Sequence, residues 1–122
     1  MSKKIPFAEA LDALNPEPAV RNMFQHFIRI CEIARPSGGE AGIRNHITRI
    51  AQQHQWPIFS DTIGNLLVRV PGRGAHREAP PILLQAHLDM VCERTPEAPT
   101  DPARDGVKPL VMGDWIVTEG TT

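Results

Sequence analysis

The chain has 122 residues, a length that suits one domain or a piece of a larger one. Its hydrophobic fraction of 41% and charged fraction of 22% are ordinary for a globular protein. The net charge of −1 provides neither a basic face for nucleic acid nor a polybasic patch for a membrane surface, so we expect no partner of either kind.

The N-terminal segment predicts the cellular compartment. Glu9 and Asp12 interrupt the first apolar run, so we expect no secretory signal. No window approaches the roughly 18 apolar residues that cross a bilayer. We therefore expect a cytoplasmic protein in which Cys31 and Cys92 are free thiols, one of them in the core of a helix.

The first part of the chain predicts a short helix and then a longer amphipathic one. Residues 6–14 form the short helix, with Pro6 at its first position. In the next segment apolar residues recur at steps of three and four, which places them on one helix face, and Pro36 ends the pattern. The residues of that face are Val20, Phe24, Phe27, Ile28 and Cys31.

A further helix is predicted to begin at Ser37 and to run to about His54. Glu40 stands three residues after Ser37, which is the spacing of a capping box. The expected buried stripe of this helix consists of Ile43, Ile47, Ile50 and Ala51.

Strands are predicted after the helices. Residues 57–60 and 66–70 read as a pair joined by a loop whose residues tolerate positive φ. Residues 82–86 are an apolar run with no polar alternation until its end, which predicts a central strand buried on both faces.

The last third of the chain predicts a long polar loop and a hairpin. The loop covers residues 91–107 and contains several prolines. The hairpin pairs residues 109–112 with 115–118 around Gly113-Asp114, a turn of type II′ because glycine comes first. Together these elements predict an α/β layered fold with no second domain.

One motif carries recognisable chemistry. His87 and Asp89 follow the predicted central strand directly, at the strand end where ligands bind in open α/β sheets. Residues two apart in an extended segment point to the same side, so the two side chains can face one cavity. Imidazole is a good zinc ligand, and a carboxylate commonly accepts the other ring N–H of such a histidine.

Spacing alone leaves a second interpretation of equal weight. In that interpretation His87 is a hydrogen-bonded buried histidine and Asp89 caps a turn. A His-x-Asp sequence occurs often by chance, so the pattern by itself does not separate a metal site from a structural pair.

The surrounding sequence resembles a known family. Residues 85–91, Gln-Ala-His-Leu-Asp-Met-Val, resemble the first metal-binding motif of the M20 metallopeptidases, and the continuation through Cys92-Glu93 is similar to the aminoacyl-histidine dipeptidase branch. The similarity runs in order from about residue 16 to the end of the chain. Other segments that carry it are 27–33, Arg35-Pro36-Ser37 with Glu40, Asp61 with 64–69, 113–115 and 119–122.

The resemblance implies a fold and a site. Residues 1–122 would be the N-terminal part of a zinc-peptidase-like catalytic domain with an incomplete sheet, residues 1–15 being a variable lead-in. His87 would be a ligand of one zinc in a two-zinc site, and Asp89 the catalytic carboxylate that orients and polarises it. The implied reaction is hydrolysis of a dipeptide of the Xaa-His type by metal-activated water, with a glutamate as general base.

Several parts of the family pattern are expected beyond Thr122. They are the metal-bridging aspartate, the general-base glutamate, the remaining ligands and the dimerisation domain. A catalytic zinc uses three protein ligands and a water, so we expect the 122-residue chain to lack peptidase activity on its own. An uncovered strand edge and helix face further predict marginal stability and self-association.

Two other functions compete with the dipeptidase interpretation. The chain could be a non-catalytic binding or regulatory fragment, or it could be related to an M20 deacylase. The Met90-Val91-Cys92-Glu93 continuation and the similarity at residues 27–33 favour the dipeptidase over the deacylase. We expect substrate preference to depend on residues beyond Thr122.

Overall fold

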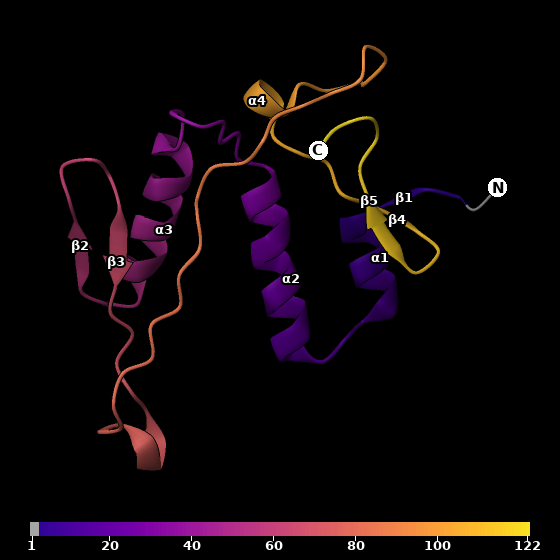
Figure 1. Ribbon diagram of the computed structural model, residues 1–122. Helices are drawn as coiled ribbons and strands as arrows, with labels where there is room; N and C mark the ends of the chain where they lie inside the picture. The colour runs from indigo at the N-terminus through magenta and orange to yellow at the C-terminus, as the bar shows by residue number, and fades with distance from the viewer. Residues whose placement is uncertain (1–2) are drawn as a thin grey trace. The chain divides into compact units, whose positions relative to one another are not determined.

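The computed structural model describes residues 3–122, which fold as helices and small antiparallel sheets (Figure 1). They form two compact units. The first comprises the described residues up to Gly42 together with Asp89–Thr122, and the second is Ile43–Leu88. This mixture confirms the predicted α/β class. Among residues 3–122 no helix is long and apolar enough to cross a membrane.

The core of the first unit forms where α1 (Phe7–Leu14) packs beside α2 (Pro18–Cys31), as Figure 1 shows. Phe7 is 6% exposed and lies edge-on against Phe24, with ring centroids 5.1 Å apart, and against Phe27 at 5.8 Å. Edge-to-face contacts of this kind add to the burial of apolar area. The single ring of Phe7 therefore organises the contact between the two helices.

The connection between α1 and α2 is held by polar contacts. Asn15 adopts a left-handed conformation with φ of 43° and donates its backbone N–H to Leu11. Pro18 begins α2, a position where its missing N–H costs no hydrogen bond. Arg21 then reaches back to the Asp12 carboxylate at 2.7 Å and to the Leu11 carbonyl at 3.2 Å. The predicted helices are confirmed here, with α1 beginning one residue later than expected.

A three-stranded antiparallel sheet completes the first unit, in the order β1 (Ile5–Pro6), β4 (Leu110–Met112) and β5 (Trp115–Val117). Within the predicted hairpin, Met112 pairs with Trp115 and Leu110 with Val117. Gly113 has a φ of +60° whereas Asp114 does not have a positive φ, as a type II′ turn requires. The hairpin is confirmed, and β1 is an addition that the sequence pattern did not reveal.

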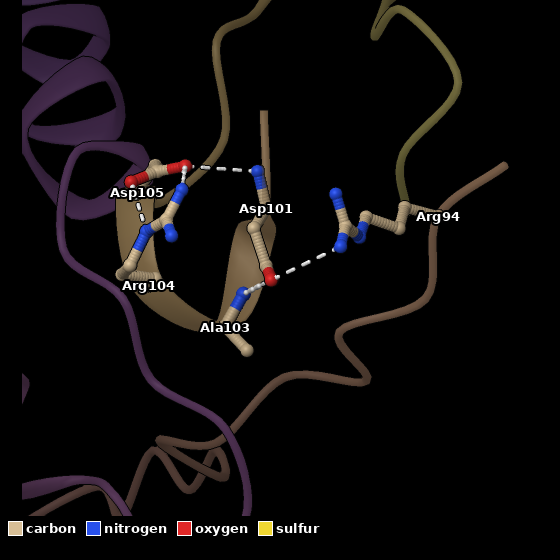
Figure 2. A network of polar contacts seen from close by, with 5 residues as sticks. All are labelled: Arg94, Asp101, Ala103, Arg104 and Asp105. Carbon is tan, nitrogen blue, oxygen red and sulfur yellow. Dashed lines mark hydrogen bonds and ion pairs between the residues drawn. The ribbon is translucent and has the colours of Figure 1, made fainter. Parts of the chain in front are cut away.

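The polar segment 91–107 contains a short helix, α4 (Pro102–Asp105), which the sequence analysis missed. Figure 2 shows the contacts that hold it. Asp101 accepts a hydrogen bond from the backbone N–H of Ala103 at 3.0 Å and lies 3.6 Å from the Arg94 guanidinium. Asp105 accepts from the Asp101 N–H and from the Arg104 side chain. The Arg104 hydrogen bond is the main reason that the pKa of Asp105 falls from 3.8 to about 2.

The link from α2 to α3 differs from its prediction. We expected Ser37 to cap the next helix, but α3 begins at Ala41. Gly39 instead donates its N–H to Pro36 at 2.7 Å, Gly38 takes a φ of +84°, and Glu40 accepts the N–H of Gly38. The predicted capping box is therefore wrong, because a tight turn over these residues takes the groups that a capping box would use.

The second unit contains all but the first two residues of α3 (Ala41–Gln53). Ile43 and Ala51 are almost fully buried, as the predicted stripe requires. At the C-terminal end Gln55 has a φ of 57°, Trp56 donates to the Ala51 carbonyl and Gln55 donates to the Gln52 carbonyl. These are the two hydrogen bonds of a Schellman motif.

The predicted hairpin of the second unit is confirmed as β2 (Ile58–Ser60) paired with β3 (Leu66–Val68). Asp61 organises the connection. Its Oδ1 accepts the backbone N–H groups of Ile63, Gly64 and Asn65 at 2.8–3.1 Å, and its Oδ2 accepts from the Asn65 side chain at 2.7 Å. The Asn65 side-chain hydrogen bond is the largest cause of a lowered pKa at Asp61.

The predicted buried central strand at residues 82–86 is wrong for this structure. Between β3 and the first unit the only regular element among the described residues is one 3-10 turn, η1 (Gly74–His76). The side chains of Ile82, Leu83 and Leu84 are 86%, 76% and 90% exposed. An extended segment becomes a strand only when a neighbouring strand accepts its backbone hydrogen bonds, and none of the described strands pairs with this one.

Candidate functional site

His87 lies near the end of the second unit, in the extended segment that follows η1. It is exposed and belongs to no helix or strand. The burial that the alternative interpretation expected for His87 is not observed, and the expected central strand before it is not formed.

Asp89 lies in the first unit and is half-buried. Its Oδ2 accepts a hydrogen bond from the Ser37 hydroxyl at 2.6 Å. The next residue, Met90, donates its backbone N–H to the Arg35 carbonyl at 2.9 Å. The turn at residues 35–39 therefore makes hydrogen bonds both to the Asp89 carboxylate and to the backbone of Met90.

Ser37 is the polar neighbour of Asp89 that the sequence analysis did not find. The pattern around it predicted a local role at a helix start, whereas its partner lies 52 residues away along the chain. A contact at that separation leaves no periodic signal in the sequence. The only available hint was the Gly38-Gly39 pair, which indicates a turn rather than a helix start.

The thiols do not contribute to a site. Cys31 is buried at the end of α2, and burial is the main cause of its raised pKa, so the thiol stays protonated near neutral pH. Cys92 donates to the Met90 carbonyl at 3.3 Å. Both cysteines are free, as predicted.

The donors on this chain do not fit a complete zinc site. Over residues 3–122, no three side chains of His, Cys, Asp or Glu gather in an arrangement that could hold a metal ion. A catalytic zinc needs three protein ligands. Among these residues, His87 can therefore be at most one member of a ligand set.

Comparison with known proteins places this geometry in context. No sequence profile of a known protein family matches the chain. The chain is 32% identical over 112 residues to the cytosol non-specific dipeptidase of Escherichia coli K12, a match that covers 92% of this chain and 22% of the relative. The crystal structure of aminoacylhistidine dipeptidase from Vibrio alginolyticus superposes with a TM-score of 0.75 at 30% identity, covering 80% of this chain and 20% of that one.

The chain is similar to one part of each of these two dipeptidases. The similarity confirms the predicted resemblance to a dipeptidase and the predicted fold class. The chain spans about a fifth of the length of both relatives. The activity of these longer proteins is therefore assigned to the 122-residue chain only as a proposal.

Proposed function

We propose that the chain carries the first metal-binding segment of a zinc-dependent dipeptidase of the cytoplasm, acting on dipeptides of the Xaa-His type. The observation that carries this proposal is the similarity to a dipeptidase over 92% of the chain, a region that includes the Gln85–Val91 motif. The names of both relatives specify dipeptides, and one name specifies the cytosol.

His87 is the metal ligand in this proposal, and Asp89 is the carboxylate that orients it. When bound, zinc would supply a Lewis acid and an activated water. A carboxylate that accepts the second ring N–H fixes the tautomer of a ligating histidine and raises its basicity. The similarity of the chain to a dipeptidase across the region that contains both residues supports these roles.

The 122-residue chain is inactive on its own in this proposal. It offers one histidine of a set that needs more donors, and the general base of the family is not identified within it. We expect no hydrolysis of a Xaa-His dipeptide in the presence of added zinc. Turnover above that of buffer would show that the ligand set is already sufficient.

Zinc binding tests the proposed ligand directly. Because the described residues hold no complete ligand set, the test uses a chimera in which this chain replaces the segment that it matches in the E. coli cytosol non-specific dipeptidase. Zinc chloride added to metal-free chimera labelled with ¹⁵N at histidine should shift the ring resonances of His87 at lower concentration than those of His26, His46, His54 and His76. His87→Asn should remove that response, and His76→Asn, a matched change at an exposed histidine, should leave it. A first response at another histidine of this chain would refute the assignment.

A second candidate is a non-catalytic fragment that binds another polypeptide or itself. The exposure of Ile82, Leu83 and Leu84 favours it, since contiguous exposed apolar surface marks interaction sites. Sedimentation velocity across a concentration series tests the self-association part of this candidate. A monomer at all concentrations would remove the self-association alternative, whereas it leaves the dipeptidase proposal intact.

A further inference from the structure

Residues 82–86 are an apolar segment whose backbone has no hydrogen-bond partner in the described part of the chain. Figure 1 draws them as an extended trace without a strand arrow. The side chains of Ile82, Leu83 and Leu84 are 86%, 76% and 90% exposed. Among residues 3–122 no hydrogen bond involves a backbone group of this segment, and no strand pairs with it. The segment therefore exposes both the apolar side chains and the backbone groups that a neighbouring strand binds.

The segment lacks the charges that keep exposed strands apart. Proteins commonly protect an unpaired strand with charged side chains, lysine above all, because such side chains oppose pairing with another chain. No Asp, Glu, Lys or Arg occurs at residues 79–88, so two copies of this segment can align without like-charge repulsion. Pro80 and Pro81 have no backbone N–H, so a ladder of hydrogen bonds begins at Ile82.

The two flanks of the segment carry opposite charge along the chain. Residues 69–78 contain three arginines and one glutamate, whereas residues 89–97 contain three acidic residues and one arginine. An antiparallel pair directs the basic flank of one copy toward the acidic flank of its partner, whereas a parallel pair brings like charges together at both ends. Complementary charge selects the orientation of two associating surfaces, so it favours antiparallel pairing of two copies here.

We propose that two copies of this chain associate by antiparallel pairing of residues 82–86, with Leu84 of one copy opposite Leu84 of the other. Alternate residues of a strand point to the same side, so this register gathers Ile82, Leu84 and Ala86 of both copies on one apolar face. The contact uses the same surface on both copies, as a two-fold symmetric pair requires. Two strands of five residues bury less than the roughly 1,200 Å² of a stable interface, so we expect weak association. The inference does not depend on the proposed dipeptidase function.

Charged substitutions at Leu84 test both the pairing and its register. In sedimentation velocity across a concentration series, the wild-type chain should move from monomer toward dimer. Leu84→Lys and Leu84→Glu should each stay monomeric at the highest concentration, because like charges then lie directly opposite each other. An equimolar mixture of the two variants should recover the dimer, because opposite charges then face each other across the pair.

Met23 provides the matched control. Its side chain is 56% exposed on α2, in the first unit, so Met23→Lys and Met23→Glu make the same changes of net charge on another exposed apolar residue. Both variants should associate as the wild type does. Leu84 is 90% exposed, so its variants should keep the wild-type circular dichroism spectrum, and a loss of association then reports the contact rather than unfolding.

Hydrogen exchange of the wild-type chain locates the contact independently. The amides of residues 82–86 should exchange freely in dilute solution and become protected at the concentrations where the dimer forms. Four results would each overturn the proposal: a wild-type chain that is monomeric throughout the series, Leu84→Lys that associates as the wild type does, a mixture of the two Leu84 variants that stays monomeric, or a dimer in which these amides remain unprotected. None of these results bears on the dipeptidase proposal, which zinc binding by the chimera tests.

Discussion

Two apolar regions of this chain differ sharply in exposure although both are rich in large hydrophobic residues. Phe7, in α1, is 6% exposed and lies against two aromatic rings of α2. Ile82, Leu83 and Leu84 are more than three-quarters exposed in an extended segment without strand partners. The difference teaches that burial follows from the presence of a complementary surface nearby, not from the hydrophobicity of the residues.

The largest expected effect comes from removing the buried ring. Phe7→Ala should lower the free energy of unfolding by about 3 kcal/mol, because it removes apolar contact and leaves a cavity between α1 and α2. The matched change Phe59→Ala, at a ring that is 56% exposed, should cost less than about 1 kcal/mol. Thermal melts followed by circular dichroism compare the two variants. Equal losses would show that the α1–α2 contact is not the core.

Substitution in the turn between β2 and β3 should cause the next largest loss of stability. Gly64 has a φ of +96°, and an added Cβ would lie 1.8 Å from Nη1 of Arg44, so this side chain must move. We expect Gly64→Ala to cost roughly 1–2 kcal/mol. Gly74→Ala also has positive φ but meets no atom within 4 Å, so it should cost less. Equal losses of stability in the two variants, measured by thermal melts, would contradict this expectation.

Low pH should lower the free energy of unfolding of both units, because each contains an aspartate with a lowered pKa, Asp61 in the second unit and Asp105 in the first. Asp61 and Asp105 have pKa values below their usual 3.8, and that of Asp105 is about 2. The unfolded chain therefore takes up protons first as the pH falls below about 4, so this stabilisation, full at neutral pH, is lost as the pH falls toward 2. The effect should be modest because both carboxylates face solvent. Asp105→Asn should show a flatter dependence of melting temperature on pH between 4 and 2 than wild type, and an unchanged slope would contradict the assignment.

The exposed apolar segment should give the smallest change in stability. Ile82→Ser combined with Leu84→Ser should alter the free energy of unfolding by no more than about 0.5 kcal/mol, since neither side chain is packed. The same variant should shift sedimentation toward monomer if the segment mediates self-association. A loss of stability comparable to that of Phe7→Ala would show that these residues are buried in solution.

The sequence predicted the elements that depend on local signals. Apolar periodicity located α2 and α3, and Gly113 identified the type II′ turn between β4 and β5. Prediction failed where the structure depends on distant partners. Nothing local indicated that residues 82–86 lack a neighbouring strand, or that Ser37 bonds Asp89 rather than the start of α3.

The surroundings of the candidate motif could be predicted only in part, for the same reason. The His87-Leu88-Asp89 motif was visible in the sequence, and its similarity to dipeptidases indicated a metal-binding segment. The Ser37 hydroxyl that donates to Asp89 lies 52 residues upstream, and this contact was visible only in the structure. The short helix α4 was hidden among prolines, although Asp101-Pro102 carried the signal of an N-cap followed by proline.

A chimera gives the most direct test of the central claim that His87 is a catalytic metal ligand of a dipeptidase. In it, this chain replaces the segment that it matches in the E. coli cytosol non-specific dipeptidase. We predict that the purified, folded chimera hydrolyses a Xaa-His dipeptide with zinc, that His87→Asn abolishes this activity, and that His76→Asn preserves it. A chimera that is as active with His87→Asn as without it would contradict the account.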